Sequence, residues 1–247
     1  MKKLYRKVKS ILYDCYCPIC IGYWDEWIEN GFEFEILKKV NIIGGGKRKH
    51  LCPNCGSPDR VRMIYSYLHS KTDLFSPKNP VVLLHVAPER QLLDIFEKNN
   101  NIEYYPCDKF NYGNNVQKAD ITQLQFVENF FDFLICNHVL EHIEDDAKAM
   151  SELYRVMKPN GIGILQIPYS ISIKTNIENN EIRLPEEREL CFGQDDHVRI
   201  YARSEYIKTL NSVGFKVSTS NPYSAHWDFN PKKLGLNKRE DLFIVQK

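Results

Sequence analysis

No stretch of the sequence approaches the roughly 18 consecutive apolar residues that a membrane-spanning helix requires. The basic start, residues 1–9, is followed by only Ile11 and Leu12 before Tyr13 and Asp14, which is too short an apolar core for a secretory signal peptide. A charge excess is also missing, because 33 basic and 32 acidic residues give a net charge of +1. This balance argues against a nucleic-acid coat or a polybasic membrane protein. We therefore expect a cytoplasmic protein without a membrane span.

Cysteine is sparse over most of the chain, which excludes a disulfide-stapled scaffold. Five of the eight cysteines fall within the first 55 residues, and the other three are scattered singly. Residues 17–20 and 52–55 form two Cys-x-x-Cys knuckles, each with proline after its first cysteine. Two such turns supply the thiolates of a closed tetrahedral Zn²⁺ site, whereas a redox pair is the alternative. The prediction is a structural zinc held by Cys17, Cys20, Cys52 and Cys55.

Charge divides the chain into two segments. Residues 1–80 carry 14 basic and 8 acidic side chains, whereas residues 81–247 carry 19 and 24. We therefore expect a zinc-ribbon domain over residues 1–79 and a second domain over residues 80–247. The run Lys47-Arg48-Lys49 in the first segment is more typical of a solvated turn than of a nucleic-acid site.

From residue 81 onward, short apolar runs rich in β-branched residues alternate with amphipathic stretches, which is typical of a parallel sheet wrapped by helices. The clearest helix is expected at 145–157, with Asp145 as its cap and Pro159-Asn160-Gly161 ending it. Strands are expected at residues 81–86, 103–106, 133–136, 162–167, 215–219 and 242–245. The fold class is therefore α/β, a doubly wound Rossmann-like sheet.

Ligands of such sheets bind outside the carboxyl ends of the central strands, so the residues after each strand are candidates for the site. Asp108 follows the second strand, where a carboxylate can accept hydrogen bonds from both hydroxyls of a ribose. Asp120 follows a further turn, where an aspartate beside a backbone amide can bind an adenine edge. The other candidates lie at or after the ends of the strands expected at 81–86 and 133–136. They are His85, Ala87, Glu89, Asn137, His138, Glu141 and His142.

The region from Val81 to about Tyr169 resembles a class I S-adenosylmethionine-dependent methyltransferase of the type 11 kind. The resemblance is carried by Phe-Asp-Phe-Leu-Ile-Cys-Asn-His-Val-Leu-Glu-His-Ile at 131–143 and Leu-Tyr-Arg-Val-Met-Lys-Pro-Asn-Gly at 153–161. It continues more weakly to the end of the chain and does not cover the zinc segment. It implies a seven-stranded, mostly parallel sheet and an S-adenosylmethionine cofactor. In the cofactor site that the resemblance implies, Asp108 would bind the ribose, and Asp120 and Ile121 would border the adenine. The methionine side would be lined by Asn137 and His138.

The first loop departs from the family. The family has a glycine-rich turn that lets the backbone approach the cofactor, whereas this chain has Ala87-Pro88-Glu89. Because proline lacks an N–H, Glu89 is expected to offer its carboxylate to the methionine ammonium or to lie near the sulfonium. His85 stands where the family often has an acid and is expected to tune this loop. The alternative is a degenerate turn that no longer binds the cofactor.

Three histidines are candidates for the catalytic base. Because the sulfonium donor is already activated, the enzyme mainly aligns the reactants and removes a proton from the acceptor. His138 is the first candidate, His197 the second and His142 the third. We expect His138, Glu141 and His142 on one face at the start of a helix.

This group allows two further interpretations. One is a divalent metal site, similar to the Glu-x-x-Glu-His of metal-dependent small-RNA 2′-O-methyltransferases. In the other, Glu141 and His142 are structural, cap the helix and support the loop, and His138 alone faces the reaction.

The sequence thus predicts S-adenosylmethionine-dependent methyl transfer to a hydroxyl or amine of a small molecule or a saccharide precursor. Residues 170–191 follow the strand at 162–167, where such folds build a substrate lid. Their acidic content disfavours a nucleic-acid substrate, so no nucleic-acid partner is expected. Two alternatives stay open, a binding protein of this fold that has lost catalysis and an RNA methyltransferase guided by the zinc ribbon.

Overall fold

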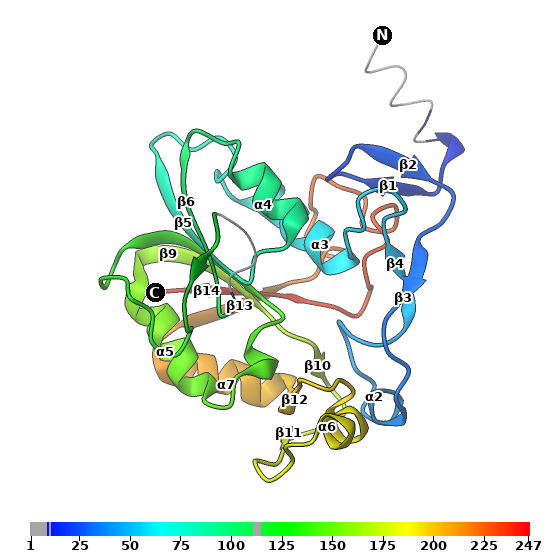
Figure 1. The fold of residues 1–247 in the computed structure, drawn as a ribbon. Helices are drawn as coiled ribbons and strands as arrows, with labels where there is room; N and C mark the ends of the chain where they lie inside the picture. Colours follow the sequence, from blue (N-terminus) through cyan, green and yellow to red (C-terminus); the bar gives the residue numbers. More distant parts are fainter. Residues whose placement is uncertain (1–8, 10, 111–114) are drawn as a thin grey trace.

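The structure is a computed structural model that describes residues 9, 11–110 and 115–247 (Figure 1). A seven-stranded sheet with the order β13-β14-β9-β8-β5-β6-β7 forms its centre. The strands are β5 (Val81–Val86), β6 (Ile102–Asp108), β7 (Gln117–Lys118), β8 (Phe131–Asn137), β9 (Met157–Gln166), β13 (Lys216–Ser220) and β14 (Leu242–Gln246). Strands β5 to β9 are parallel, and β14 runs antiparallel to its neighbours β9 and β13. The expected doubly wound, mostly parallel Rossmann-like sheet is confirmed.

Helices cover both faces of the sheet (Figure 1). Helices α3 (Asp59–Lys71) and α4 (Arg90–Phe96) pack on the face that includes Leu83 and Phe133. Helices α5 (Asp146–Val156) and α7 (Arg203–Val213) pack on the face that includes Leu84 and Leu134. Successive side chains of a strand point to opposite faces, so each central strand contributes to both cores. This explains why the strands read as continuous apolar runs.

Helix α5 begins as expected and ends earlier. The Asp145 side chain accepts a hydrogen bond from the Lys148 N–H at 3.0 Å and caps the first turn. The expected helix end at Met157 is wrong, because Met157 is already extended, with φ −73° and ψ 137°, and begins β9. Residues 159–161 therefore lie inside a strand. Met157 leaves the helix because it pairs with Phe131 of β8.

The segment before β5 combines small hairpins with a helix that belongs to the main core. Its elements are β1 (Cys15–Cys17), β2 (Gly22–Trp24), β3 (Ile28–Asn30), α2 (Glu35–Lys39) and β4 (Arg48–Leu51), with β1 paired to β2 and β3 to β4. In α3, Val61, Ile64 and Leu68 are fully buried in the same cluster as Leu83 of β5. A division of the chain at residue 80 would cut this cluster and stays a prediction.

A second small sheet lies beside the N-terminal segment. Strands β10 (Tyr169–Ser170), β11 (Ile177–Glu178) and β12 (Arg199–Ala202) pair in the order β10-β12-β11, and α6 (Pro185–Phe192) lies between β11 and β12 in the sequence. Helices α2 and α6 lie side by side (Figure 1), with Val40 packed in one cluster with Phe192 and Ile200. The described part of the chain contains no helix that is long and apolar enough for a membrane span.

Candidate active site

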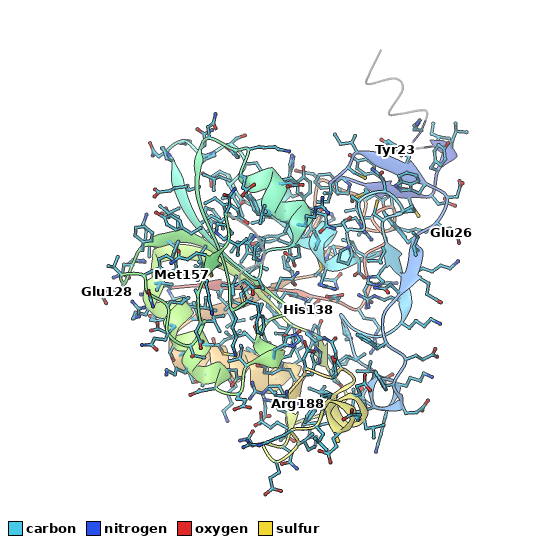
Figure 2. All side chains as sticks on the ribbon, in the orientation of Figure 1. Tyr23, Glu26, Glu128, His138, Met157 and Arg188 are labelled. Atoms are coloured by element: carbon cyan, nitrogen blue, oxygen red, sulfur yellow. The ribbon has the colours of Figure 1, made fainter. Side chains whose placement is uncertain are left out.

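The order of the strands reverses between β5 and β8. The chain passes from β5 to β6 and β7 on one side and then returns to β8 on the other. Doubly wound sheets bind ligands in the crevice that such a reversal opens at the carboxyl ends of the strands. Residues 87–89 follow β5, Asn137 is the last residue of β8, and His138 follows it. Figure 2 shows His138 between the sheet and the N-terminal segment.

The Glu89 carboxylate is held by side chains of β5 and β8. Its Oε2 lies 3.1 Å from His85 Nε2, its Oε1 accepts a hydrogen bond from Asn137 Nδ2, and His85 Nδ1 lies 2.9 Å from the Tyr104 hydroxyl. Burial disfavours the charged form, but the hydrogen bond and charge of His85 outweigh it and hold the pKa of Glu89 below its usual value. The crevice therefore contains a buried carboxylate that stays ionised and favours a cationic ligand group.

The turn after β5 is shaped without glycine. Ala87 adopts the left-handed conformation with φ 47°, which an L-residue rarely adopts. Its N–H donates to the Cys107 carbonyl at 2.8 Å, and Pro88 has no N–H. Neither of the first two residues of this turn can therefore donate a backbone hydrogen bond to a ligand.

Asp108 lies at the carboxyl end of β6 and lines a cavity of about 400 Å³. Its Oδ1 accepts a hydrogen bond from the Phe110 N–H at 2.7 Å. The cavity is lined by Pro88, Arg90, Leu93, Asp94, Asp108 and Val116. A half-buried carboxylate at a strand end, beside an open cavity, suits the binding of ribose hydroxyls, and this role stays a prediction.

Asp120 and Ile121 lie after β7 and line neither this cavity nor the one described below. The exposed Asp120 carboxylate accepts hydrogen bonds from the Thr122 N–H at 2.8 Å and the Thr122 hydroxyl at 2.7 Å. Ile121 is buried in the core of the sheet. The expected adenine contacts of both residues stay predictions.

His138 and Glu141 form a close pair after β8. The expectation that His138 opens a helix is wrong, because it precedes a three-residue 3₁₀ turn, η1 (Leu140–His142), and has φ 55°. His138 Nδ1 lies 3.4 Å from Glu141 Oε1. Glu141 is only 1% exposed, and neither carboxylate oxygen has a hydrogen-bond partner in the described part of the chain. The expected capping role of Glu141 is therefore wrong, since no side chain caps η1.

Burial shifts the pKa of both groups toward their neutral forms. It raises the pKa of Glu141 to about 7. Burial and the charge of Arg60 lower the pKa of His138 well below its usual value. The His138 Nε2 atom is buried and has no hydrogen-bond partner among the described residues. A neutral imidazole with an uncommitted nitrogen is able to accept a proton from a bound molecule.

His142 and His197 lie on the other side of Glu141. Their rings meet edge to face at a centroid distance of 4.7 Å, and one ligand atom each of Glu141, His142 and His197 lie within 4.8 Å of one another. Burial would lower the pKa of His142, but its hydrogen bond to Asp196 raises the pKa above the usual value. Burial and the charge of His142 lower the pKa of His197 to about 4. Such a trio suits a divalent cation as well as proton transfer.

These histidines face a second cavity of about 270 Å³. Segments distant in sequence form its wall. The N-terminal part of the chain contributes β3, the 44–46 glycine loop and the start of α3. The rest of the wall comes from the end of β8 and residues 192–200. Its polar and charged lining residues include Arg48, His50, Arg60, His138, Glu141, His142, Gln194, His197 and Arg199. The N-terminal segment therefore contributes directly to the candidate acceptor site. Nothing in the sequence pointed to Arg60 in particular, because it follows a cysteine knuckle that was expected to belong to a separate domain.

The four knuckle cysteines are brought together. The Sγ atoms of Cys17 and Cys55 lie 3.7 Å apart, those of Cys20 and Cys52 lie 3.6 Å apart, and all four lie within 4.8 Å of one another. Sulfurs about 2.3 Å from a tetrahedral zinc ion are separated by about 3.8 Å, so the arrangement fits this metal. Cys15 is not part of the cluster, and its Sγ contacts the Asp25 carbonyl.

Comparison with known proteins identifies the central part of the chain. Residues 84–165 match the model of a methyltransferase domain family. Over 103 residues the chain is 27% identical to a sterol 24-C-methyltransferase of Yarrowia lipolytica, covering 40% of this chain and 26% of that protein. It is 26% identical over 145 residues to a demethylmenaquinone methyltransferase of Lactobacillus johnsonii, covering 56% of this chain and 50% of that protein. The chain thus spans half or less of the length of these curated relatives.

Solved methyltransferase structures are among those to which the chain is similar. One S-adenosylmethionine-dependent methyltransferase of Archaeoglobus fulgidus is 17% identical, with a TM-score of 0.48, over 75% of this chain and 93% of that one. The matched residues, 84–165, run from β5 to β9 and include the strand reversal, Glu89, Asp108 and His138. Residues 84–165 therefore match a methyltransferase domain, and this part of the chain is similar to class I S-adenosylmethionine-dependent methyltransferases.

Proposed function

We propose that the protein transfers a methyl group from S-adenosylmethionine to a hydroxyl or amine of a small molecule or saccharide precursor. The observation that carries this proposal is the pair of His138 and Glu141. It lies at the carboxyl end of β8, in a cavity of about 270 Å³, with an uncommitted imidazole nitrogen.

The crevice offers groups for the ribose and for the methionine ammonium of the cofactor. Asp108 would bind the ribose hydroxyls, and the ionised Glu89 would bind the methionine ammonium. His85 and Asn137 hold the Glu89 carboxylate in position. The bound cofactor supplies a methyl group on a positively charged sulfur. The protein's own task is to align the acceptor with that methyl group and to exclude water.

His138 would remove the acceptor proton. Its low pKa keeps the imidazole neutral, and the adjacent Glu141 carboxylate would stabilise the imidazolium that forms. His197 and His142 are the next candidates for this role. The same residues support a second candidate, a divalent cation bound by Glu141, His142 and His197 that would hold the acceptor oxygen.

Two features support a small acceptor. The second cavity is partly enclosed by the N-terminal segment and by residues 192–200, and its volume of about 270 Å³ suits a small molecule. Both curated relatives are named for small organic substrates, a sterol and demethylmenaquinone.

We also propose that Cys17, Cys20, Cys52 and Cys55 bind a structural zinc ion, because four thiolates leave no open position for chemistry.

The first test is calorimetry with S-adenosylhomocysteine, the product form of the cofactor. Micromolar binding is expected. No heat and no shift of the melting temperature at millimolar ligand would contradict the enzyme proposal and favour a binding protein that has lost catalysis.

The second test is incubation with S-adenosylmethionine carrying a labelled methyl group and with fractionated small-molecule extract or RNA. Label is expected in the small-molecule fraction. Label in RNA would favour the RNA methyltransferase alternative. Loss of turnover in a chelator, with the zinc content unchanged, would favour the second cation over His138 as the group that activates the acceptor.

A further inference from the structure

One charged side chain of the acceptor cavity has a buried hydrogen-bond donor without an acceptor. Arg60 lines the cavity, and its Nε atom has no hydrogen-bond partner among the described residues. Its Nε atom is nevertheless buried. A buried guanidinium N–H without an acceptor costs free energy unless a ligand supplies one.

The other two arginines of the same wall are fully engaged. Arg48 donates to both carboxylate oxygens of Asp59, at 3.1 and 2.8 Å, and to carbonyls of the 44–46 loop. Arg199 donates to the Glu178 carboxylate and to the carbonyls of Ile143 and Glu144. Neither is available for a bound anion, so Arg60 is the uncommitted cation of this wall.

The zinc knuckle fixes Arg60 next to the first loop. The Cys55 carbonyl accepts a hydrogen bond from Gln91 Nε2 of α4 at 2.9 Å, which joins the knuckle to the helix that follows Glu89. The buried Arg62, two residues beyond Arg60, donates to carbonyls of Ser57 and His50. These hydrogen bonds anchor the first turn of α3 to the residues before it and join the knuckle to α4.

Arg60 also lies within electrostatic reach of both strand ends. Its positive charge helps to lower the pKa of Glu89 after β5 and of His138 and Glu141 after β8. Glu89 is bonded to Asn137, the neighbour of His138. Arg60, His138 and Glu141 line the same cavity, and the bond between Asn137 and Glu89 connects the end of β8 beside this cavity to the turn after β5.

The methionine part is a zwitterion, and the first two residues of the turn after β5 offer no donor for its carboxylate. Glu89 suits the ammonium. The carboxylate finds no donor at Ala87, whose N–H is committed to Cys107, or at Pro88. We propose that Arg60 binds the methionine carboxylate of the cofactor, so that the zinc segment completes the cofactor site. A guanidinium presents paired N–H donors that match a carboxylate.

This proposal rests on the proposed function, and calorimetry with two ligands tests it. The ligands are S-adenosylhomocysteine and its decarboxylated analogue, which keeps the amine and lacks the carboxylate. The variants are Arg60→Gln, Arg60→Lys and, as the control, Arg183→Gln, which removes the same charge from an exposed position before α6. Melting temperature and zinc content confirm that each variant is folded.

Arg60→Gln should weaken the binding of S-adenosylhomocysteine roughly 10- to 100-fold, as expected for the loss of a hydrogen-bonded charge pair. It should leave the affinity of the decarboxylated analogue within about 2-fold of wild type, and Arg60→Lys should give an intermediate loss for S-adenosylhomocysteine. Equal losses for both ligands would overturn the proposal. Unchanged affinity for S-adenosylhomocysteine would also overturn it and assign Arg60 to an anionic group of the acceptor. If wild type bound neither ligand, the proposed function itself would fail.

Discussion

The surroundings of Glu141 do not suit a charged carboxylate. A carboxylate that is 1% exposed and has no hydrogen-bond partner among the described residues is unfavourable in its charged form, which is why burial raises its pKa to about 7. Such groups gather at functional sites. The sequence motif predicted that Glu141 lies near His138 and His142, but burial and the lack of partners depend on the tertiary contacts of η1 with β12.

We expect turnover to depend on the ionisation of Glu141. Its pKa of about 7 means that the carboxyl is mostly neutral below pH 7 and mostly charged above it. Because only the charged form stabilises an imidazolium on His138, kcat should rise with pH through an apparent pKa of about 7. Glu141→Gln should lower kcat on the order of 10-fold and remove this step from the pH profile. A step that persists in Glu141→Gln would assign the titration to another group.

His138→Ala should lower turnover by ~10²-fold or more and leave the affinity for S-adenosylhomocysteine nearly unchanged, because proton removal acts in the transition state. Single-turnover rates and calorimetry measure the two effects. The control is His69→Ala, which removes an exposed imidazole from α3. A variant with full turnover would leave His197 as the next candidate for the base.

Asp108→Ala should weaken the binding of S-adenosylhomocysteine by about 30- to 150-fold, because a carboxylate that accepts hydrogen bonds from two hydroxyls contributes about 2 to 3 kcal/mol. The control is Asp94→Ala, which removes a carboxylate from the wall of the same cavity and should change the affinity little. Calorimetry at constant salt measures both. Equal losses in the two variants would mean that the overall charge of the cavity, and no specific contact, holds the ribose.

At the scale of elements, local sequence patterns predicted the strands of the sheet. They did not predict the contacts between segments that are distant in the sequence. The six expected strands are present, with ends shifted by a few residues, and continuous apolar runs mark those that are buried on both faces, such as β5 and β8. The two-residue β7 was missed, since so short a strand leaves no pattern. The role of α3 was missed as well. Its buried face contacts residues of β5 and α4, and nothing in its own sequence names those partners.

The two knuckles should depend on zinc. Metal analysis should find about one Zn²⁺ per chain, and Cys52→Ser should reduce this content strongly because a closed site needs all four thiolates. Since the Cys55 carbonyl holds Gln91 of α4, the variant should also bind S-adenosylhomocysteine less tightly. Cys191→Ser, which lies outside the cluster, is the control. Full zinc content in Cys52→Ser would contradict the assignment of the ligands.

At the scale of the whole molecule, the zinc segment and the region from β10 to β12 enclose one cavity against the end of the sheet. Residues 30–60 approach from one side and residues 192–200 from the other. The family resemblance covered neither the first of these segments nor its contacts, so the sequence did not predict that residues 30–60 line the acceptor cavity. Acceptor specificity is then expected to depend on side chains of both segments.

The shared core of α3 and the sheet predicts that the chain unfolds as one unit. Leu68 of α3 is 1% exposed and packs in the cluster that contains Leu83 of β5. Leu68→Ala should lower the free energy of unfolding of the whole protein by about 2 to 5 kcal/mol, whereas Leu184→Ala, at a residue that is 58% exposed, should change it by less than about 0.5 kcal/mol. Urea unfolding followed by far-UV circular dichroism and by tryptophan fluorescence measures both. A single transition, shifted equally for the two probes, is expected. A separate transition for the zinc segment, with the sheet unaffected by Leu68→Ala, would instead support an independent domain ending near residue 80.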